Sequence, residues 1–391
     1  MDGTTGTITL TAKGMRWHQT RHPWIYQSDL KAPDSSLSGQ VVRVKAPQGR
    51  LLGKAFYNAQ SKIGLRWLTD DPDQPVDRDF WKRRLTRAYQ MRQRVVQDAD
   101  AYRLISSEAD GFPGFIVDRY GPVLALQSLS MGIDRAVPLL TELLVELLRP
   151  EAIVARNDSS VRKLEGLTVE KRILVGKQPG RIQVREGDRR YGVDVWEGQK
   201  TGGYLDQREN RIRAKEYTKG RVLDAFAYQG GFTLQVASKA ERVLAIEDSE
   251  AAVQMLKENM GLNQISNVDV ERANSFDRLK MLDRAGEKFD LVILDPPAFA
   301  KAKKELPDAW RGYREINLRA LRILSSGGIL ISCSCSYQIS DEIFMEILRQ
   351  ASAGAGRTVR LLESRTQSRD HPIVLTHPES KYLKCLVMEV E

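Results

Sequence analysis

The sequence predicts an α/β protein in which two small domains precede a larger, doubly wound and mostly parallel sheet. From Arg181 onward, strand patterns alternate regularly with helix patterns, as they do where crossover helices join parallel strands. Two turn-rich breaks, at residues 70–75 and 176–180, separate that region from the rest of the chain. The 391 residues are 41% hydrophobic and 28% charged, which suits a globular chain with several cores. The domains are expected at residues 1–76, 77–180 and 181–391.

The two small domains differ in type. The first is predicted to be a small β-barrel or sandwich, because short strand-like stretches recur between turns. Its strands are expected at residues 7–10, 40–45, 51–56 and 63–68. The second is predicted to be an α+β unit that opens with a helix. Strands at 114–118 and 124–129, a helix at 135–148, and strands near Ile153 and Ile173 are expected to follow.

The third domain begins with a hairpin pattern at residues 181–196 and then alternates between strands and helices. In such sheets ligands bind outside the carboxyl ends of the strands, so the loops after strands should carry the chemistry. Strands are expected at 221–226, 243–246, 268–271, 290–294 and 328–332, and helices at 231–239, 251–263 and 317–324.

The charge balance suggests a polyanionic partner, because 60 lysines and arginines face 51 acids and give a net charge of +9. The run 13–24 mixes cations with aromatic rings, a combination that suits stacking on bases, although its tryptophans could equally lie in a barrel core. The run 82–94 holds six cations, including Arg92 and Arg94, and no acid, so they are predicted to be unpaired and to face phosphates. Acids of another domain could also cover them. Candidate phosphate contacts are Arg16, Arg21, Lys82, Arg83, Arg84 and Arg87.

The chain has three cysteines and four histidines. So few cysteines do not make a disulfide scaffold, and without a CxxC pair no metal site is expected. No stretch approaches the roughly 18 apolar residues that a membrane span needs. The N-terminus lacks the basic start and apolar stretch of a signal peptide. These observations predict a soluble, cytoplasmic protein without a membrane partner.

The loop after the first strand of the parallel sheet is a candidate ligand site. That strand ends at Asp224, and the adjacent glycines Gly230 and Gly231 allow a tight turn and a close ligand approach. The loop matches neither GxGxxG nor a P-loop, so an adenosine cofactor without a pyrophosphate fits better. A plain glycine turn between strand and helix is the alternative.

An acid ends the next strand, 23 positions after Asp224. This is close to the roughly 20-residue spacing at which a carboxylate binds ribose hydroxyls in nucleotide-binding folds. This residue is Glu247, and we favour it as the ribose ligand because it occurs together with the glycine loop. An acid at a strand end can also be merely solvated or cap the next helix. Asp248 or Ser249 could supply that cap instead.

Two later strand ends carry further candidates. Two prolines follow Asp295 and fix the backbone, so the loop up to Phe299 is a rigid place for a planar base or amide; a simple strand end is the alternative. The next strand runs into Cys333 and Cys335, which would share one side if the strand continued and would be separated by a turn. Two cysteines without nearby histidines make a poor metal site, which favours a nucleophilic thiolate. Cys385 is predicted to be a buried hydrophobe.

Together these residues resemble a known family, the bacterial 23S ribosomal RNA cytosine-C5 methyltransferases with an N-terminal PUA domain. The resemblance covers essentially the whole chain, and the order of its motifs is highly specific. The motifs are RHPW at 21–24, YRLI at 102–105, EADGFPG at 108–114, KTGGYLDQR at 200–208, GGF at 230–232, DPP at 295–297 and SCS at 334–336.

The resemblance implies a Rossmann-like class I methyltransferase domain after the PUA and central α+β domains, with S-adenosyl-L-methionine as methyl donor. It implies 23S rRNA, or a large-subunit assembly intermediate, as partner of a monomer or homodimer. Many relatives have aspartate at the position of Asn274, and some have lysine at that of Ala298. The residues implied at the cofactor are Gln207, Arg208, Asp224, Phe226, Tyr228, Gly230, Phe232, Glu247, Asn274 and Asp295.

Cys335 matches the family nucleophile, whereas the family fills the position of Cys333 variously. Thiolate addition at C6 would make cytosine C5 nucleophilic enough to accept a methyl group. Asp295 would contact the N3/N4 edge of the base, with Pro297 and Phe299 beside it. Two alternatives remain: methylation of a guanine nitrogen on the same fold, which needs no cysteine, and a non-catalytic RNA-binding assembly factor.

Overall fold

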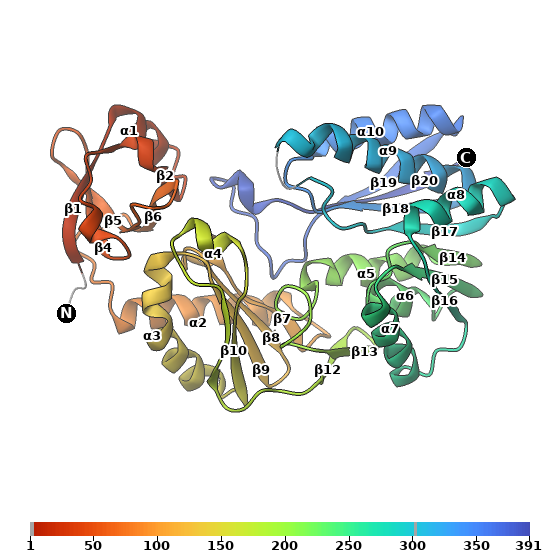
Figure 1. The fold of residues 1–391 in the computed structure, drawn as a ribbon, viewed down its shortest axis with the longest axis horizontal. Helices are drawn as coiled ribbons and strands as arrows, with labels where there is room; N and C mark the ends of the chain where they lie inside the picture. The colour runs from red at the N-terminus through yellow and green to blue at the C-terminus, as the bar shows by residue number, and fades with distance from the viewer. Residues whose placement is uncertain (1–3, 301–302) are drawn as a thin grey trace. The chain divides into compact units, whose positions relative to one another are not determined.

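The computed structural model describes residues 4–300 and 303–391, which form two compact units (Figure 1). Residues 1–3, the first part of the N-terminus that is predicted to lack a signal peptide, lie outside the described residues. The predicted division into three domains stays a prediction. Unit 1 contains residues 4–184, 193–205 and 369–380, and unit 2 contains residues 185–192, 206–368 and 381–391.

The first sheet of unit 1 has six strands in the order β2-β6-β5-β4-β1-β3. All four predicted strands are confirmed, and alternate residues of β4, Val42 and Val44, point into the core. β2, β3 and α1 were not predicted, because they are too short to show a clear apolar period. The elements are β1 (Thr4–Leu10), α1 (Ala12–Gln19), β2 (Trp24–Tyr26), β3 (Leu30–Lys31), β4 (Val41–Lys45), β5 (Leu51–Tyr57) and β6 (Ile63–Thr69).

The second sheet of unit 1 has five strands in the order β11-β10-β9-β8-β7 and shares one apolar core with α2 and α3. The predicted α+β character is confirmed, but β7 and α4 were not predicted. Trp81 and Leu85 of α2 and Leu140 and Leu144 of α3 are buried in that core. The elements are α2 (Arg78–Val95), β7 (Ala101–Ser106), β8 (Phe115–Tyr120), β9 (Val123–Ser128), α3 (Met131–Leu148), β10 (Ala152–Asn157), α4 (Val161–Leu164) and β11 (Glu170–Val175).

The prediction that all six cations of residues 82–94 are unpaired is wrong for Lys82, whose ammonium lies 3.8 Å from Glu146, and for two further cations of the run. Arg92 is fully buried, and its guanidinium donates to both carboxylate oxygens of Asp110 at 2.6 and 2.7 Å. Arg84 donates to two backbone carbonyls outside its helix, and burial lowers its pKa to about 10. Positions 84 and 92 are eight apart, which puts both on the face of α2 that packs against the sheet. Lys82, Arg83, Arg87 and Arg94 are exposed.

Unit 2 is built on a seven-stranded sheet in the order β16-β15-β14-β17-β18-β20-β19, which confirms the predicted doubly wound sheet. Strands β14 to β18 pair in parallel, while β20 runs antiparallel between β18 and β19. The order reverses between β14 and β17, and such a switch point is where α/β sheets bind ligands. The predicted hairpin is confirmed as β12 (Ile182–Glu186) and β13 (Arg189–Val193). The sheet strands are β14 (Arg221–Asp224), β15 (Arg242–Glu247), β16 (Val268–Arg272), β17 (Phe289–Leu294), β18 (Leu324–Ser334), β19 (Val359–Arg365) and β20 (Lys384–Val390).

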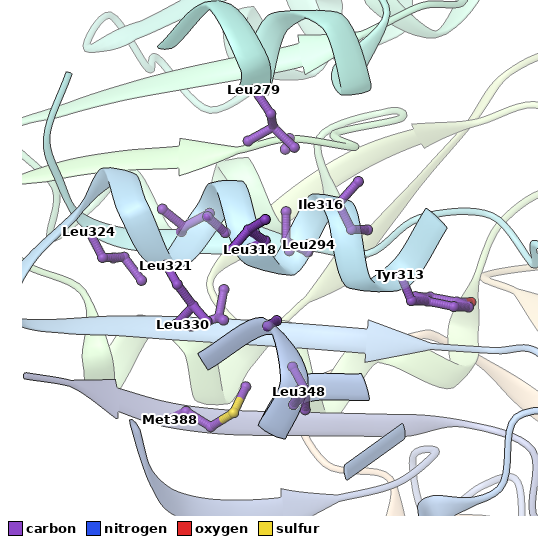
Figure 2. Close-up of a cluster of buried hydrophobic side chains, with 14 of the residues drawn as sticks. Leu279, Leu294, Tyr313, Ile316, Leu318, Leu321, Leu324, Leu330, Leu348 and Met388 are labelled. Atoms are coloured by element: carbon purple, nitrogen blue, oxygen red, sulfur yellow. The ribbon is translucent and has the colours of Figure 1, made fainter. Parts of the chain in front are cut away.

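Helices cover both faces of this sheet, with α8, α9 and α10 on one face and α6 and α7 on the other (Figure 1). Figure 2 shows Tyr313, Ile316 and Leu321 of α9 in the apolar cluster that also contains Leu294 and Leu330 of the sheet. The helix predicted at 317–324 begins eleven positions earlier, because charged residues interrupt the apolar period of its first turns. No helix among the described residues is long and apolar enough to cross a membrane. The helices are α5 (Arg208–Ala214), α6 (Gly231–Val236), α7 (Glu250–Leu262), α8 (Ser275–Ala285), α9 (Leu306–Ile323) and α10 (Asp341–Ala355).

Candidate active site

Neighbouring parallel strands bring the predicted acids to one edge of the unit 2 sheet. β14 pairs in parallel with β15 and β17, and β17 pairs in parallel with β18. Asp224 and Glu247 end β14 and β15, and Asp295 directly follows β17. The carboxyl ends of parallel strands lie at the same edge, so these acids and the cysteines at the end of β18 share one edge of the sheet.

The loop between β14 and α6 is shaped by Gly230. Its φ is +89°, and a Cβ built on it would lie 2.3 Å from a methyl carbon of Leu256. Tyr228 in the same loop also has a positive φ, +47°, and the amide of Ala227 donates to the carbonyl of Ile246 in β15. The loop is therefore a tight, backbone-bound turn in which only glycine fits at position 230.

Glu247 is half-buried and holds two backbone amides. One carboxylate oxygen accepts from the Tyr228 amide at 2.8 Å and the other accepts from the Ser249 amide at 2.9 Å. A carboxylate has about four acceptor positions, so it can still accept hydroxyl hydrogens. Asp248 and Ser249 were the two predicted caps of α7, and the structure shows Ser249 in that position. Glu247 is therefore not used as the cap and is available for a ribose.

Asp224 points into the protein and is 0% exposed. Its Oδ2 accepts from the amide and hydroxyl of Thr233 at 3.0 and 2.7 Å, while its Oδ1 is buried without a hydrogen-bond partner. Burial raises the pKa of Asp224 to about 7, although the bonds from Thr233 oppose that rise. An unsatisfied acceptor at the switch point fits a site that is completed by a ligand donor.

Asp295 is held by a chain of amide groups. Nε2 of Gln207 donates to Asp295 Oδ1 at 2.8 Å, and Oε1 of Gln207 accepts from Asn210 at 2.7 Å. This chain fixes which end of the Gln207 amide faces the acid. Arg208 follows at the start of α5 and is buried, with Glu209 3.4 Å away.

Aromatic rings connect the glycine loop with the Asp-Pro-Pro loop. Phe299 packs against Tyr313 and Phe276 at centroid distances of 4.5 and 5.5 Å, and Phe276 packs against Phe226 at 6.3 Å. Phe232 is buried in α6, and Pro297 is exposed. Asn274 caps α8 by accepting from the Phe276 and Asp277 amides through its side-chain oxygen, a role that no sequence pattern predicted.

The end of β18 separates the two cysteines, which answers the question that the sequence left open. β18 ends at Ser334, so Cys335 lies beyond the strand and is half-buried. Cys333 is 0% exposed, lies opposite Cys385 in the sheet, and has a pKa raised well above its usual value by burial. The thiolate is the reactive form of a cysteine, and burial disfavours that form at Cys333.

Two further side chains at this edge were not predicted. The hydroxyl of Tyr313 lies 3.1 Å from the hydroxyls of Ser334 and Ser336, on both sides of Cys335. The ammonium of Lys384 in β20 donates to the Ser336 carbonyl at 2.8 Å. Both lie far from Cys335 in sequence, so no local motif could have indicated them.

The cations that the sequence offers as phosphate contacts all belong to unit 1. Arg16 and Arg21 are exposed, and Arg21 lies 3.5 Å from Asp70. Lys82, 3.8 Å from Glu146, is exposed, as are Arg83 and Arg87, whereas Arg84 is committed to backbone carbonyls and is withdrawn as a candidate contact.

One cluster among the described residues offers three metal-binding side chains, His22, His377 and Glu379 of unit 1. The His22 ring is already used on both sides. Its Nδ1 accepts from the Trp24 amide at 3.1 Å, so Nε2 carries a hydrogen and donates to Glu379 at 3.0 Å. With this tautomer neither nitrogen of His22 has a free lone pair for a metal ion. The contact between His22 and Glu379 instead ties segment 369–380 to the first part of unit 1.

Comparisons with known proteins agree with this geometry. A PUA-like domain model matches residues 8–70, and an S-adenosylmethionine-dependent methyltransferase model matches residues 169–374. The strand order, the acids at the sheet edge and these matches define an S-adenosyl-L-methionine-dependent methyltransferase with an N-terminal PUA-like domain.

The chain belongs to the family of the ribosomal RNA large subunit methyltransferase I proteins. It is 38% identical over 379 residues to the protein of that name from Serratia proteamaculans and 36% identical to that from Escherichia coli O139:H28. Each match covers 94% of this chain and 96% of the relative.

Solved structures show the same fold. A protein described as a methyltransferase and solved with SAH has a TM-score of 0.84 at 17% identity. A protein from Streptococcus mutans, described as a SAM-dependent methyltransferase, has a TM-score of 0.83 at 18% identity. Both alignments cover 98% of this chain and 100% of the other.

The buried carboxyl of Asp224 should make stability depend on pH. Its folded pKa of about 7 lies above the ordinary 3.8, so the folded chain holds the extra proton between these values and loses stability as pH rises through them. Asp224→Asn keeps an oxygen for Thr233 but carries no charge. The thermal midpoint of the cofactor-free variant should therefore fall less than that of the wild type between about pH 5 and pH 8. Asp248→Asn, at an exposed acid, is the control, and parallel curves for Asp224→Asn and the wild type would contradict this assignment.

Proposed function

We propose that this protein methylates C5 of a cytosine in 23S rRNA through a covalent adduct between Cys335 and cytosine C6. The observation that carries the proposal is the position of Cys335, half-buried just beyond β18 at the ligand-binding edge of the sheet. The names of the relatives, ribosomal RNA large subunit methyltransferase I, support the substrate class. Ribosomal RNA as substrate also supports a cytoplasmic location.

The loop and acids at this edge fit an adenosyl cofactor. Glu247 retains acceptor capacity for ribose hydroxyls, and Gly230 lets the backbone of the loop approach the cofactor closely. Asp224 Oδ1 is an unsatisfied acceptor, and the aromatic row from Phe226 to Phe299 offers flat surfaces. Bound S-adenosyl-L-methionine supplies an electrophilic methyl group. The proposed cofactor residues are Gln207, Arg208, Asp224, Phe226, Tyr228, Gly230, Phe232, Glu247, Asn274 and Asp295.

The chain's own residues would act on the base in three steps. The Cys335 thiolate adds to C6, which breaks the C5–C6 double bond and moves electron density onto C5 and the N3 side of the ring. Asp295, held by Gln207, would face the N3/N4 edge, donate a proton to N3 to neutralise the negative charge that develops there, and take that proton back when the thiolate leaves. After C5 has taken the methyl group, loss of the C5 proton to a base restores the double bond and expels the thiolate. Pro297 and Phe299 would line the place of the cytosine ring, which must be unstacked from its neighbours in the RNA to reach it.

The exposed cations of unit 1 are the proposed RNA contacts. Arg16 and Arg21 lie in the PUA-like part, and Lys82, Arg83 and Arg87 share α2. Phosphate contacts of this kind supply affinity that falls as salt rises, because binding releases counterions. The division into domains at 1–76, 77–180 and 181–391 is part of the same proposal, and the partner is 23S rRNA or an assembly intermediate containing it.

Cys335→Ala should abolish methyl transfer to 23S rRNA while leaving S-adenosyl-L-methionine affinity within about twofold, since the thiol contacts the base and not the cofactor. Cys333→Ala is the matched control and should retain most of the activity, because Cys333 is a buried core residue. Unmethylated rRNA transcripts with radiolabelled cofactor measure the transfer. RNA carrying 5-fluorocytosine at the target should become covalently trapped on the wild type. Full activity of Cys335→Ala would move the reaction to the guanine-nitrogen class.

Glu247→Ala should weaken S-adenosyl-L-methionine binding by roughly 1–3 kcal/mol, the usual cost of losing a buried hydrogen-bond partner. The variant also releases the Tyr228 amide, so the glycine loop loses one of its supports. Titration calorimetry gives the affinity, and Asp248→Ala at the next position is the control. Unchanged affinity in Glu247→Ala, or an equal loss in the control, would show that another group holds the ribose.

Reversing three charges on α2, in the combined variant Lys82→Glu, Arg83→Glu and Arg87→Glu, should weaken binding to 23S rRNA and flatten its salt dependence. Each phosphate group that the variant no longer binds should lower the slope of log affinity against log salt by about 0.7–0.9. A variant with the same charge change on unit 2, Lys257→Glu, Lys280→Glu and Arg284→Glu, is the control. If both variants lose affinity equally, only net charge matters and α2 is not the contact surface.

A further inference from the structure

Lys384 is a buried cation whose position needs an explanation. It is 4% exposed, and among the described residues no carboxylate forms an ion pair with it. Its ammonium instead donates to two backbone carbonyls, those of Ser336 at 2.8 Å and Tyr382 at 2.9 Å. Burying an ammonium without a counter-charge is costly in free energy, so packing alone does not explain a lysine at this position.

The carbonyl that Lys384 binds belongs to the residue after Cys335. Lys384 lies opposite Ser334 in the β18–β20 ladder, and its side chain reaches past the end of β18 to Ser336. Tyr313 contacts the hydroxyls of both serines from α9. The segment 334–336 that carries the thiol is therefore held by the hydroxyl of Tyr313, which contacts the serines on both sides of Cys335, and by the ammonium of Lys384, which binds Ser336.

Of these two groups only the ammonium brings charge. Burial raises the pKa of Tyr313 to about 12, so its hydroxyl is neutral at physiological pH. Burial lowers the pKa of Lys384 to about 8, so most of it is still protonated at pH 7. The titratable groups facing Lys384 are Asp341, Cys335 and Lys381, and Asp341 is already paired with Lys381.

We propose that Lys384 is the positioning residue of the nucleophile, and that its ammonium fixes segment 334–336 and stabilises the thiolate of Cys335. A cation close to a thiol favours the thiolate, and it does so more strongly in a half-buried place than in water. The missing counter-charge of Lys384 is then the thiolate itself. This inference rests on the proposed role of Cys335 and adds to it the group that activates the thiol.

Lys384→Gln tests the charge, because glutamine retains hydrogen-bond donors for the Ser336 carbonyl but is neutral. Alkylation of Cys335 by iodoacetamide, followed by mass spectrometry of its peptide across pH, reports the thiolate without any methylation. The midpoint should rise by about one pH unit, which is about tenfold less thiolate at neutral pH. Methyl transfer at pH 7 should fall about tenfold and recover as pH is raised, with the affinity for cofactor and RNA within about twofold.

Two further variants separate charge from packing. Lys384→Arg retains the cation and should recover part of the low alkylation midpoint. Lys381→Gln, at the exposed neighbour paired with Asp341, should leave the midpoint unchanged. An unchanged midpoint in Lys384→Gln would overturn the proposal, as would Lys384→Arg behaving like Lys384→Gln.

The wild type alone gives a test that needs no folded variant. A Cys335 midpoint at or above the ordinary value of about 8.5 would overturn the proposal, and a clearly lower one is expected. The alkylation readout also keeps this inference apart from the proposed function. If Cys335→Ala were fully active while the Cys335 midpoint depended on Lys384, the proposed reaction would fail and the contact between charge and thiol would stand.

Discussion

The parallel pairing of β14, β17 and β18 is the constraint on which the site depends. The central residues of each strand are apolar and buried between helices, and polar residues become possible again at the carboxyl end. Parallel neighbours all end at the same edge, and the chain therefore places Asp224, Asp295 and Cys335 side by side without any of them being near in sequence. The antiparallel β20 enters the same sheet from the opposite direction, so its first residue, Lys384, also starts at this edge.

Buried charged groups in the two units differ in their partners, and this difference favours a functional role for those at the edge of the unit 2 sheet. Arg92 in unit 1 is fully buried but meets a carboxylate in two short bonds, so its charge is satisfied within the chain. Asp224 retains one oxygen without a donor, and Lys384 meets carbonyls but no acid. Groups left incomplete by the fold are the ones that a ligand or a reacting atom can complete.

The sequence could predict the sheet, its strand ends and the acids after them, because apolar strands followed by polar residues leave a local pattern. It could not decide between Cys333 and Cys335, since that depends on the position at which β18 stops. It predicted Arg84 as a surface cation, because a run without acids does not show which residues face the core. The sequence could not predict the role of Tyr313, because this residue contacts the serines beside Cys335 from α9, far away in sequence.

The contacts of segment 369–380 affect how the two units can be studied separately. The segment lies between β19 and β20 in the chain, yet it packs within unit 1, where Glu379 accepts from His22 and Asp370 accepts from the Arg103 amide. A cut at residue 181, which the sequence favours as a boundary, would remove both of those partners. The freed segment ends only a few residues before Lys384, which binds the carbonyl of Ser336. A truncated methyltransferase domain could therefore lose activity only because the segment around Cys335 has moved. Loss of activity in such a fragment would therefore not show that the first 180 residues recruit RNA, whereas charge reversal on α2 leaves these contacts in place.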